Sequence, residues 1–275
     1  MNYKKIDILD IPIDVLTTEQ TLRKIEDFVA SKKPRQICTV NPEIIIETQK
    51  NERFKKILQE SALNTADGVG IAWAAKYLSR KIKSEKYSGA SRFLSNVFWL
   101  KITLLSIIFA KKWLLSEIPE RVTGVDLVWK IAELAEKKSW GIYLLGAGEG
   151  IAKKTAQKMI SAYPNLKIVG AYAGFPQEKG LVKKIAETKP DILFVAFGSP
   201  RQEIFISQNL RNLKVSVAIG VGGSFDFIAG RAKRAPKFFQ KLGLEWLWRL
   251  ILEPKRALRI YNATVKFVCL VFRQG

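Results

Sequence analysis

Residues 140–172 read WGIYLLGAGEGIAKKTAQKMISAYPNLKIVGAY, and their pattern indicates the fold class. An apolar run at 140–145 is followed by a glycine-rich turn, a helical pattern at 151–162 and a second apolar run at 167–172. Short, continuously apolar runs that alternate with helical patterns are typical of parallel strands that are buried on both faces. The stretch therefore predicts a strand, a covering helix and a neighbouring strand of a parallel sheet.

The same rhythm extends in both directions along the chain. We expect helices at 126–138, 178–188 and 200–211, and strands at 191–197, 214–219, 36–40 and immediately before Asp67. The start of the chain at 6–15 is strand-like, and Thr17 with Gln20 forms a capping box for the helix that follows. Together these patterns predict an α/β fold, a Rossmann-like parallel sheet covered by helices, over residues 1–229.

The composition excludes several kinds of catalysis. The chain has 275 residues, 46 Lys and Arg against 25 Asp and Glu, a net charge of +21, and no histidine. Without histidine there is no Ser-His-Asp triad, no Cys-His pair and no imidazole base. Proton transfer near neutral pH must then use another group, and a carboxylate with a modestly raised pKa is the simplest choice. Asp67, which ends a predicted strand beside Gly68, is the leading candidate.

The positive charge is concentrated in two segments. Residues 76–121 hold 10 Lys and Arg with 3 Glu, and residues 230–275 hold 11 with 2 Glu. Both segments are also rich in apolar and aromatic residues. This pattern predicts a nearly neutral body that meets an anionic surface through two extensions. Nucleic acid is one such surface, but a nucleic-acid binder would leave the glycine-rich turns described below unexplained, so we expect an anionic membrane and no nucleic acid.

The first extension is an apolar insert at about 87–118. Its apolar run at 93–110 is at the lower limit for a membrane-spanning helix, has Lys101 at its middle, and has basic residues at both ends. We favour an interfacial or re-entrant helix over a span or a helix that packs on the protein. All three arrangements remain open at this stage.

The second extension, residues 230–275, is expected to be a helical, membrane-associating appendage. Tryptophan and basic residues alternate with apolar ones over 242–272, and Pro254 should divide the segment into two helices. Arg249, Arg256 and Arg259 would share a face if the helices stack across the proline. Such a face could contact lipid phosphates, close over a diphosphate, or remain solvated.

Three glycine-rich turns follow predicted parallel strands and therefore point to one crevice at the carboxyl edge of the sheet. The turns are Gly146-Ala147-Gly148-Glu149-Gly150, Phe197-Gly198-Ser199-Pro200-Arg201-Gln202-Glu203 and Gly220-Val221-Gly222-Gly223-Ser224-Phe225-Asp226. In the first turn, Gly146, Gly148 and Glu149 could contact a nucleotide diphosphate, although a merely tight turn is the alternative. In the second, Ser199 is expected to cap the next helix in a capping box with Gln202, and Gly198 permits close approach of a ligand. In the third, Gly222 lies where a ligand would bind.

Several motifs together resemble the WecG/TagA/CpsF family of bacterial glycosyltransferases. They are Thr39-Val40-Asn41-Pro42-Glu43, Thr65-Ala66-Asp67-Gly68-Val69-Gly70, Glu120-Arg121-Val122-Thr123-Gly124-Val125-Asp126, the second and third glycine-rich turns, and the basic Gly230-Arg231-Ala232-Lys233-Arg234-Ala235-Pro236. The motifs follow one another over nearly the whole chain. The long insert between Tyr77 and Pro119 departs from the family pattern.

The resemblance implies a reaction and a set of site residues. The reaction is inverting, metal-independent transfer of N-acetylmannosamine from a UDP donor to undecaprenyl-diphosphate-linked N-acetylglucosamine, in the synthesis of a cell-wall polymer or surface polysaccharide. Asp67 would be the base, with Thr39 and Asn41 beside it in the donor pocket and Arg121 and Gln202 near the substrate. Arg249, Arg256 and Arg259 would close over the diphosphate.

The resemblance leaves some properties open. Another UDP-sugar, such as the mannosaminuronic acid or a plain hexose, would fit the same chemistry. No cofactor or metal is expected, because the UDP-sugar is itself a substrate. The enzyme would work in the cytoplasm, attached peripherally to the inner face of the membrane unless the insert spans the bilayer or re-enters it. The oligomeric state is undetermined, and a homo-oligomer is compatible with the sequence.

Overall fold

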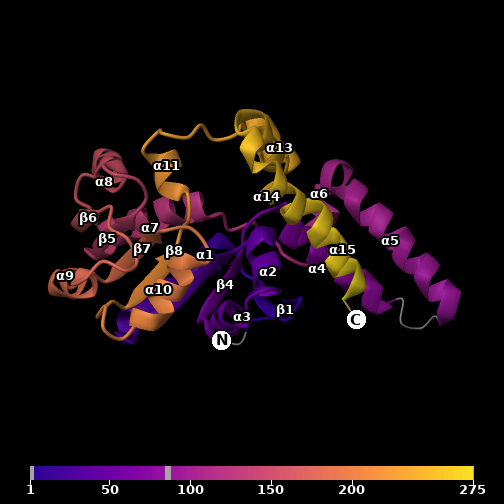
Figure 1. Cartoon of the computed structure of the whole chain (residues 1–275), viewed down its shortest axis with the longest axis horizontal. Helices are drawn as coiled ribbons and strands as arrows, with labels where there is room; N and C mark the ends of the chain where they lie inside the picture. The colour runs from indigo at the N-terminus through magenta and orange to yellow at the C-terminus, as the bar shows by residue number, and fades with distance from the viewer. Residues whose placement is uncertain (1–2, 84–87, 275) are drawn as a thin grey trace.

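The computed structural model describes residues 3–83 and 88–274 and is built on one six-stranded parallel sheet (Figure 1). The strand order is β4-β3-β8-β7-β5-β6. The strands are β3 (Arg35–Val40), β4 (Leu63–Ala66), β5 (Gly141–Gly146), β6 (Lys167–Tyr172), β7 (Ile192–Ala196) and β8 (Val217–Gly220). The predicted α/β class and the parallel sheet are therefore confirmed, and strand ends differ from the predicted ones by at most a few residues.

Helices cover both faces of the sheet, as continuously apolar strands require. One face packs against α1 (Thr18–Ser31), α7 (Gly124–Lys138), α8 (Ile151–Ala162) and α11 (Ser224–Ile228). The other packs against α2 (Pro42–Thr48), α3 (Glu52–Glu60), α9 (Leu181–Glu187) and α10 (Arg201–Asn209). Neighbouring residues of one strand serve opposite faces: Ile37 belongs to the first core and Cys38 to the second. Because helices cover both faces of the sheet, the loops at its carboxyl edge stay exposed and can carry the functional residues.

The beginning of the chain forms a small hairpin instead of a single strand. Strands β1 (Lys5–Ile8) and β2 (Ile11–Asp14) pair antiparallel, and Leu9 and Asp10 between them both adopt positive φ. The expectation of one strand-like segment at 6–15 is corrected, because a two-residue turn of this kind reverses the chain. The capping box of Thr17 and Gln20 at the start of α1 is confirmed.

The insert contains a long helix, α5 (Gly89–Phe109), and a short helix, α6 (Lys111–Leu114), which pack against α4 (Val69–Lys83). Figure 1 shows α5 at the far end of the molecule from β6, with the C-terminal helix α15 (Phe267–Arg273) running nearby. Tyr87, at the predicted start of the insert, lies outside the described residues. Within the part of the chain that the structure describes, α5 alone is long and apolar enough to cross a membrane, judged by length and composition.

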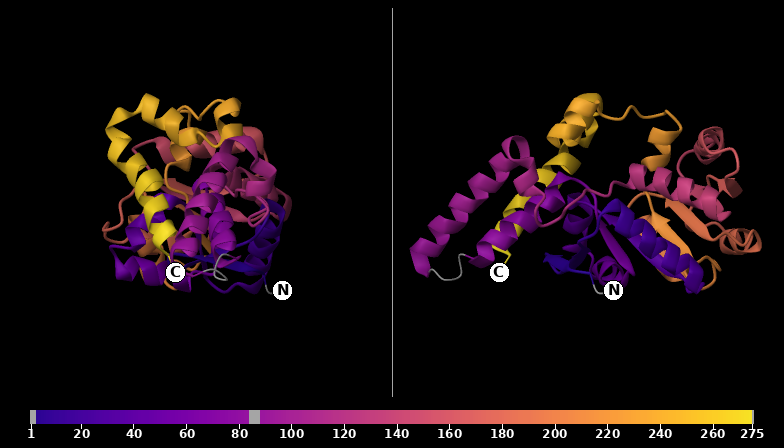
Figure 2. Two further views of the ribbon diagram at one scale, coloured as in Figure 1. Left: turned by 90° about the vertical axis from the view of Figure 1, so that its right-hand side faces the viewer. Right: turned by 180° about the vertical axis from the view of Figure 1, so that it is seen from behind.

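The last 46 residues wrap back over the body (Figure 2). Helices α12 (Lys237–Leu242) and α13 (Glu245–Leu252) are followed by a 3-10 turn at Pro254–Arg256, then by α14 (Ala257–Tyr261), a π-helical stretch at Asn262–Lys266 and α15. The predicted break at Pro254 is thus present. Phe267 and Val271 of α15 are buried in the core formed by α2, α4 and the hairpin. The proposed domain boundary at residue 230 stays a prediction.

Candidate active site

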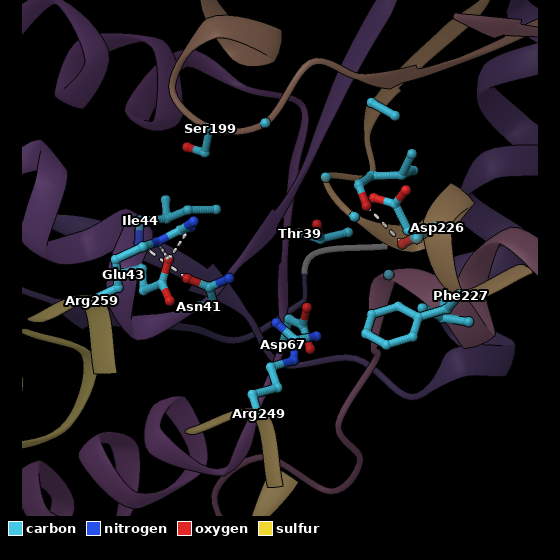
Figure 3. A pocket seen from close by; sticks show the side chains of 18 of the residues that line it. Thr39, Asn41, Glu43, Ile44, Asp67, Ser199, Asp226, Phe227, Arg249 and Arg259 are labelled. Carbon is cyan, nitrogen blue, oxygen red and sulfur yellow. Dashed lines mark hydrogen bonds and ion pairs between the residues drawn. The ribbon is translucent and has the colours of Figure 1, made fainter. Parts of the chain in front are cut away.

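A cavity of about 1030 Å³ lies between the carboxyl edge of the sheet and the C-terminal appendage. Its lining comes from the segments that follow β3, β4, β7 and β8, from the start of α7, and from α13 and α14 (Figure 3). The structure brings nine of the predicted site residues to this cavity: Thr39, Asn41, Asp67, Gly198, Gln202, Gly222, Arg249, Arg256 and Arg259. The predicted crevice at the carboxyl edge therefore exists, and the appendage forms its opposite wall.

Asp67 is the carboxylate at the end of β4. Its backbone N–H donates to Val40 O at 2.8 Å, which continues the pairing with β3 for one more residue. Gly68 then turns the chain with a φ of +94°, a conformation that glycine adopts without strain. The Asp67 carboxylate accepts a hydrogen bond from the backbone N–H of Gly124, the first residue of α7. It is therefore fixed in place at a helix N-terminus, where negative charge is favoured.

The surroundings of Asp67 give it the pKa of a usable base. Burial raises the pKa of Asp67 to about 6, and the negative charge of Glu245 also raises it. Arg249 and Arg121 act in the opposite direction and lower it. Since a general base works best with a pKa near the operating pH, this balance suits proton abstraction at neutral pH. Its side chain also lines the cavity, where a substrate hydroxyl could reach it.

Thr39 and Asn41 lie beside Asp67 at the end of β3, and both also have structural roles. The Thr39 hydroxyl donates to Gly220 O at 3.1 Å and so ties β3 to the end of β8. The Asn41 side-chain oxygen accepts from the backbone N–H of Ile44 at 3.0 Å and caps α2. The Asn41 side chain also lines the cavity (Figure 3).

Gln202 supports two of the glycine turns, and this corrects the predicted capping box. Ser199 does not cap α10: the N-cap is Pro200, which makes no side-chain cap bond. Gln202 instead accepts, through Oε1, from the backbone N–H groups of Gly198 at 3.1 Å and Gly222 at 3.0 Å. Because Gly198 follows β7 and Gly222 follows β8, one amide oxygen joins two turns of the cavity wall.

Glu203 is a site residue that the sequence reasoning missed. It is fully buried, and its Oε1 accepts from Gln202 Nε2 at 2.7 Å. Burial raises the pKa of Glu203 above its ordinary value. The sequence held one signal for Glu203. It directly follows Gln202 on the side of the helix that faces the sheet, and a charged residue is rarely buried in such a place without a partner. Glu203 holds the Gln202 amide nitrogen, so that the amide oxygen is directed at the two backbone N–H groups.

The three appendage arginines reach the cavity from three consecutive elements. Arg249 lies on α13, with its guanidinium 5.1 Å from the ring centre of Phe227. Arg256 lies on the 3-10 turn and pairs with Glu253 at 2.7 Å. Arg259 lies on α14 and pairs with Glu43 at 2.6 Å. All three arginines line the same cavity, although they come from separate elements instead of one helix face, and the two glutamates, which also line it, were not foreseen.

Four predicted residues do not line the cavity. Arg121 is turned toward the appendage, where its Nη2 donates to Gln240 O at 3.1 Å and its Nη1 lies 3.7 Å from Glu245 Oε1. It acts on Asp67 only through its charge. Gly146, Gly148 and Glu149 also lie outside the lining, and the expected diphosphate contact there stays a prediction. A Cβ on Gly148 would come within 2.8 Å of Arg231 Nη1, so the absence of a side chain leaves room for an arginine of the cavity wall.

A further ion pair holds the segment that leads into the appendage. Arg234 donates to both carboxylate oxygens of Asp126, at 2.6 and 2.8 Å, and lowers the pKa of Asp126. A bidentate pair of this geometry fixes orientation as well as distance. Over residues 3–83 and 88–274, no group of three or more Cys, Asp or Glu side chains is arranged to hold a metal ion.

The comparisons with known proteins agree with this geometry. The model of the glycosyl transferase WecG/TagA/CpsF family matches residues 6–99 and 105–275. The chain belongs to this family. It is a glycosyltransferase, and the predicted resemblance is confirmed.

Named members of the WecG/TagA/CpsF family cover most of the chain. A Bacillus subtilis protein is 32% identical over 236 residues, which cover 86% of this chain and 78% of that one. A Bacillus spizizenii protein is 28% identical over 99% of this chain and 92% of its own length, and a Staphylococcus aureus protein is 26% identical over 96% and 91%. All three are named N-acetylglucosaminyldiphosphoundecaprenol N-acetyl-beta-D-mannosaminyltransferase.

Proposed function

We propose that this glycosyltransferase moves N-acetylmannosamine from UDP-N-acetylmannosamine to undecaprenyl-diphosphate-linked N-acetylglucosamine, with inversion at the anomeric carbon. The observation that carries the proposal is a fixed carboxylate, Asp67, that faces a cavity bordered by Arg249, Arg256 and Arg259. This arrangement supplies a base for the acceptor and positive charge for the leaving group. The names of the family members support the choice of sugar and acceptor.

The reaction is a single displacement. Asp67 accepts the proton of the attacking acceptor hydroxyl while the hydroxyl oxygen bonds to the anomeric carbon of the donor sugar. The bond from that carbon to the diphosphate breaks on the opposite side, and UDP leaves with the bonding electrons. Holding the two substrates in one cavity lowers the barrier by orientation, and Asp67 contributes general base catalysis.

Departing UDP requires positive charge, and the arginines provide it. Arginine binds phosphate oxygens with planar, charge-assisted hydrogen bonds, which also stabilise the charge that develops in the transition state. Arg256 and Arg259 pair with Glu253 and Glu43, so diphosphate binding would exchange one anionic partner for another. We therefore propose that the reaction needs no metal ion and no other cofactor.

The acceptor places the enzyme at a membrane. A polyprenyl diphosphate keeps its hydrocarbon tail in the bilayer, so the cavity has to be brought to the lipid surface. The basic and aromatic appendage, with Phe238, Ile251 and Leu258 all more than half exposed, is suited to the headgroup region of an anionic membrane. We propose peripheral attachment at the cytoplasmic face.

The test is a screen of donors against a short-chain lipid-diphosphate acceptor. UDP-N-acetylmannosamine, its uronic acid and UDP-hexoses would be compared by UDP release and by the mass of the product, with and without a chelator. We expect product from UDP-N-acetylmannosamine at the same rate in both conditions, and none from the Asp67→Ala variant. Turnover by Asp67→Ala equal to that of the wild type would contradict the assignment of the base.

A further inference from the structure

Helix α5 has one strongly apolar side that is exposed. The large apolar residues on that side are exposed by 36% at Ile102 and up to 80% at Phe109, whereas others, such as Leu104 and Ile107, pack against the core. The exposed residues recur along one side of the helix and are Phe93, Leu94, Phe98, Ile102, Leu105, Ile108 and Phe109. We call these seven side chains the outer face of α5. An apolar stripe of this length is unusual on a surface that meets water.

The opposite side of α5 carries polar groups that are turned toward the protein. Asn96, Thr103 and Ser106 are buried. The Thr103 hydroxyl accepts from Trp73 Nε1 at 3.1 Å and donates to Trp99 O at 2.7 Å. A helix on a water-soluble surface normally carries polar side chains on its outward side, whereas the outward side of α5 is mostly apolar. The polarity of α5 therefore fits a helix with protein on one side and lipid on the other.

The helix is held firmly in this orientation. The Arg80 guanidinium of α4 lies between Trp99 of α5 and Trp113 of α6, 5.1 Å from each ring centre. At the other end of the helix, the rings of Phe93 and Phe272 meet edge to face at 6.3 Å. These contacts fix the orientation of α5, so the folded protein holds the outer face exposed.

The charge around the outer face fits an anionic surface. No acidic residue occurs between Lys86 and Ser116, whereas Arg92, Lys101, Lys111 and Lys112 fall within that interval. Lys101 is exposed at the middle of the helix. Its long aliphatic stem lets the ammonium group reach the headgroups while the apolar neighbours are inserted. A basic, apolar helix of this kind lies in the plane of the interface.

We infer that the outer face of α5 is a second membrane-docking surface, which inserts into the headgroup and acyl boundary of an anionic bilayer while the polar face stays on the protein. This inference rests on the proposed function, because it adds a contact that orients the cavity toward a lipid-borne acceptor. It assigns a role to the apolar insert, of which residues 100–104 lie outside the match to the family model. Two other arrangements compete with this one. In the first, two copies of the chain dock to each other through the outer face, and in the second, α5 spans the membrane.

Vesicle co-sedimentation tests the inference. Full-length protein would be mixed with vesicles of phosphatidylcholine alone or with phosphatidylglycerol. We expect binding that requires phosphatidylglycerol and that falls about tenfold or more in the double variant Phe98→Glu, Leu105→Glu, because two large apolar side chains no longer insert. The matched control is Ile160→Glu, Phe175→Glu, which changes two exposed apolar residues on other parts of the body and should bind like the wild type.

Depth and assembly measurements separate the competing arrangements. An environment-sensitive dye on a cysteine at position 105, in a Cys269→Ser background, should be quenched most by lipids brominated near the headgroup. Strongest quenching at the bilayer centre would indicate a span and overturn the inference. So would unchanged vesicle binding by the double variant, or a wild-type dimer that the variant converts to a monomer without any vesicle binding.

A soluble, short-chain acceptor distinguishes failure of this inference from failure of the proposed function. With that acceptor the double variant should match the wild type, whereas with an acceptor embedded in phosphatidylglycerol vesicles it should be slower by about the factor lost in binding. Absence of transfer by the wild type with both acceptors would contradict the proposed function and leave the vesicle result to stand on its own.

Discussion

Arg249, near the end of the chain, is the cation that acts most strongly on the carboxylate of Asp67, and its side chain extends toward Asp67 in Figure 3. Asp67 belongs to the sheet edge and Arg249 to the appendage. Burial raises the pKa of Asp67 to about 6, and Arg249 keeps the pKa from rising further. Docking of the appendage therefore completes the catalytic environment as well as the wall of the cavity.

The first prediction concerns the pH dependence of transfer. Because the base must be ionised, kcat/KM should rise with pH and level off above an apparent pKa near 6. Replacing the cation in Arg249→Gln should move this apparent pKa upward, because a favourable partner of the carboxylate is lost. Arg249→Lys is the control and should leave the midpoint nearer that of the wild type. Identical midpoints in all three proteins would show that Arg249 does not tune Asp67.

The second prediction concerns Asp67→Asn. Transfer should fall by about 10²–10⁴-fold, the usual contribution of a general base, while UDP binding measured by calorimetry is retained. A simultaneous loss of UDP binding would assign Asp67 to the binding of the nucleotide.

The same variant should be more stable than the wild type at neutral pH. The pKa of Asp67 is higher in the folded protein than in the unfolded chain, so the folded state holds more protons between about pH 4 and pH 6 and loses stability as pH rises through that window. Asn carries no such cost, and Asp67→Asn should gain about 1–3 kcal/mol at pH 7.5. Thermal unfolding across pH checks this, since the difference should shrink as the pH falls from about 6 to about 4 and should be small below that.

The third prediction concerns the link between the two glycine turns. Gln202→Leu removes the acceptor for the backbone N–H groups of Gly198 and Gly222 and takes away one of the donors to the Glu203 carboxylate. Buried polar groups without partners cost about 1–3 kcal/mol, so the melting temperature should fall and the KM for the donor should rise. Glu203→Gln keeps an oxygen that can accept from Gln202 and should stay near the wild type in both. A Gln202→Leu variant with an unchanged melting temperature would show that the link is dispensable.

The fourth prediction concerns the arginine face. Arg256→Glu should lower activity on a lipid-linked acceptor by about tenfold or more, because a charge that meets the diphosphate is reversed. Glu253→Gln removes the ion-pair partner of Arg256 and should not lower activity. Equal rates for Arg256→Glu and the wild type would assign Arg256 to the solvated surface.

The architecture of this protein could be predicted from local patterns in its sequence. Apolar runs, caps and glycine turns are local signals, and they located strands β5 to β8, the break at Pro254 and the base candidate Asp67. The order of parallel strands then requires that residues after β3, β4, β7 and β8 share one edge, so most of the candidate site could be predicted as well.

Which of those residues face the cavity depends on long-range packing and could not be predicted from the sequence. Gln202 fits a capping box by spacing, yet its amide oxygen satisfies N–H groups on two different turns, one of them 20 residues away. The turn at Gly146 has the right local form but lies outside the cavity lining, and Arg121 is directed into the appendage. Likewise, periodicity identified an apolar helix at α5, but which side of it packs on the protein depends on contacts with α4 and α15. Each of these outcomes depends on which residues that are distant in the sequence become neighbours in the fold. Local sequence patterns do not encode such contacts.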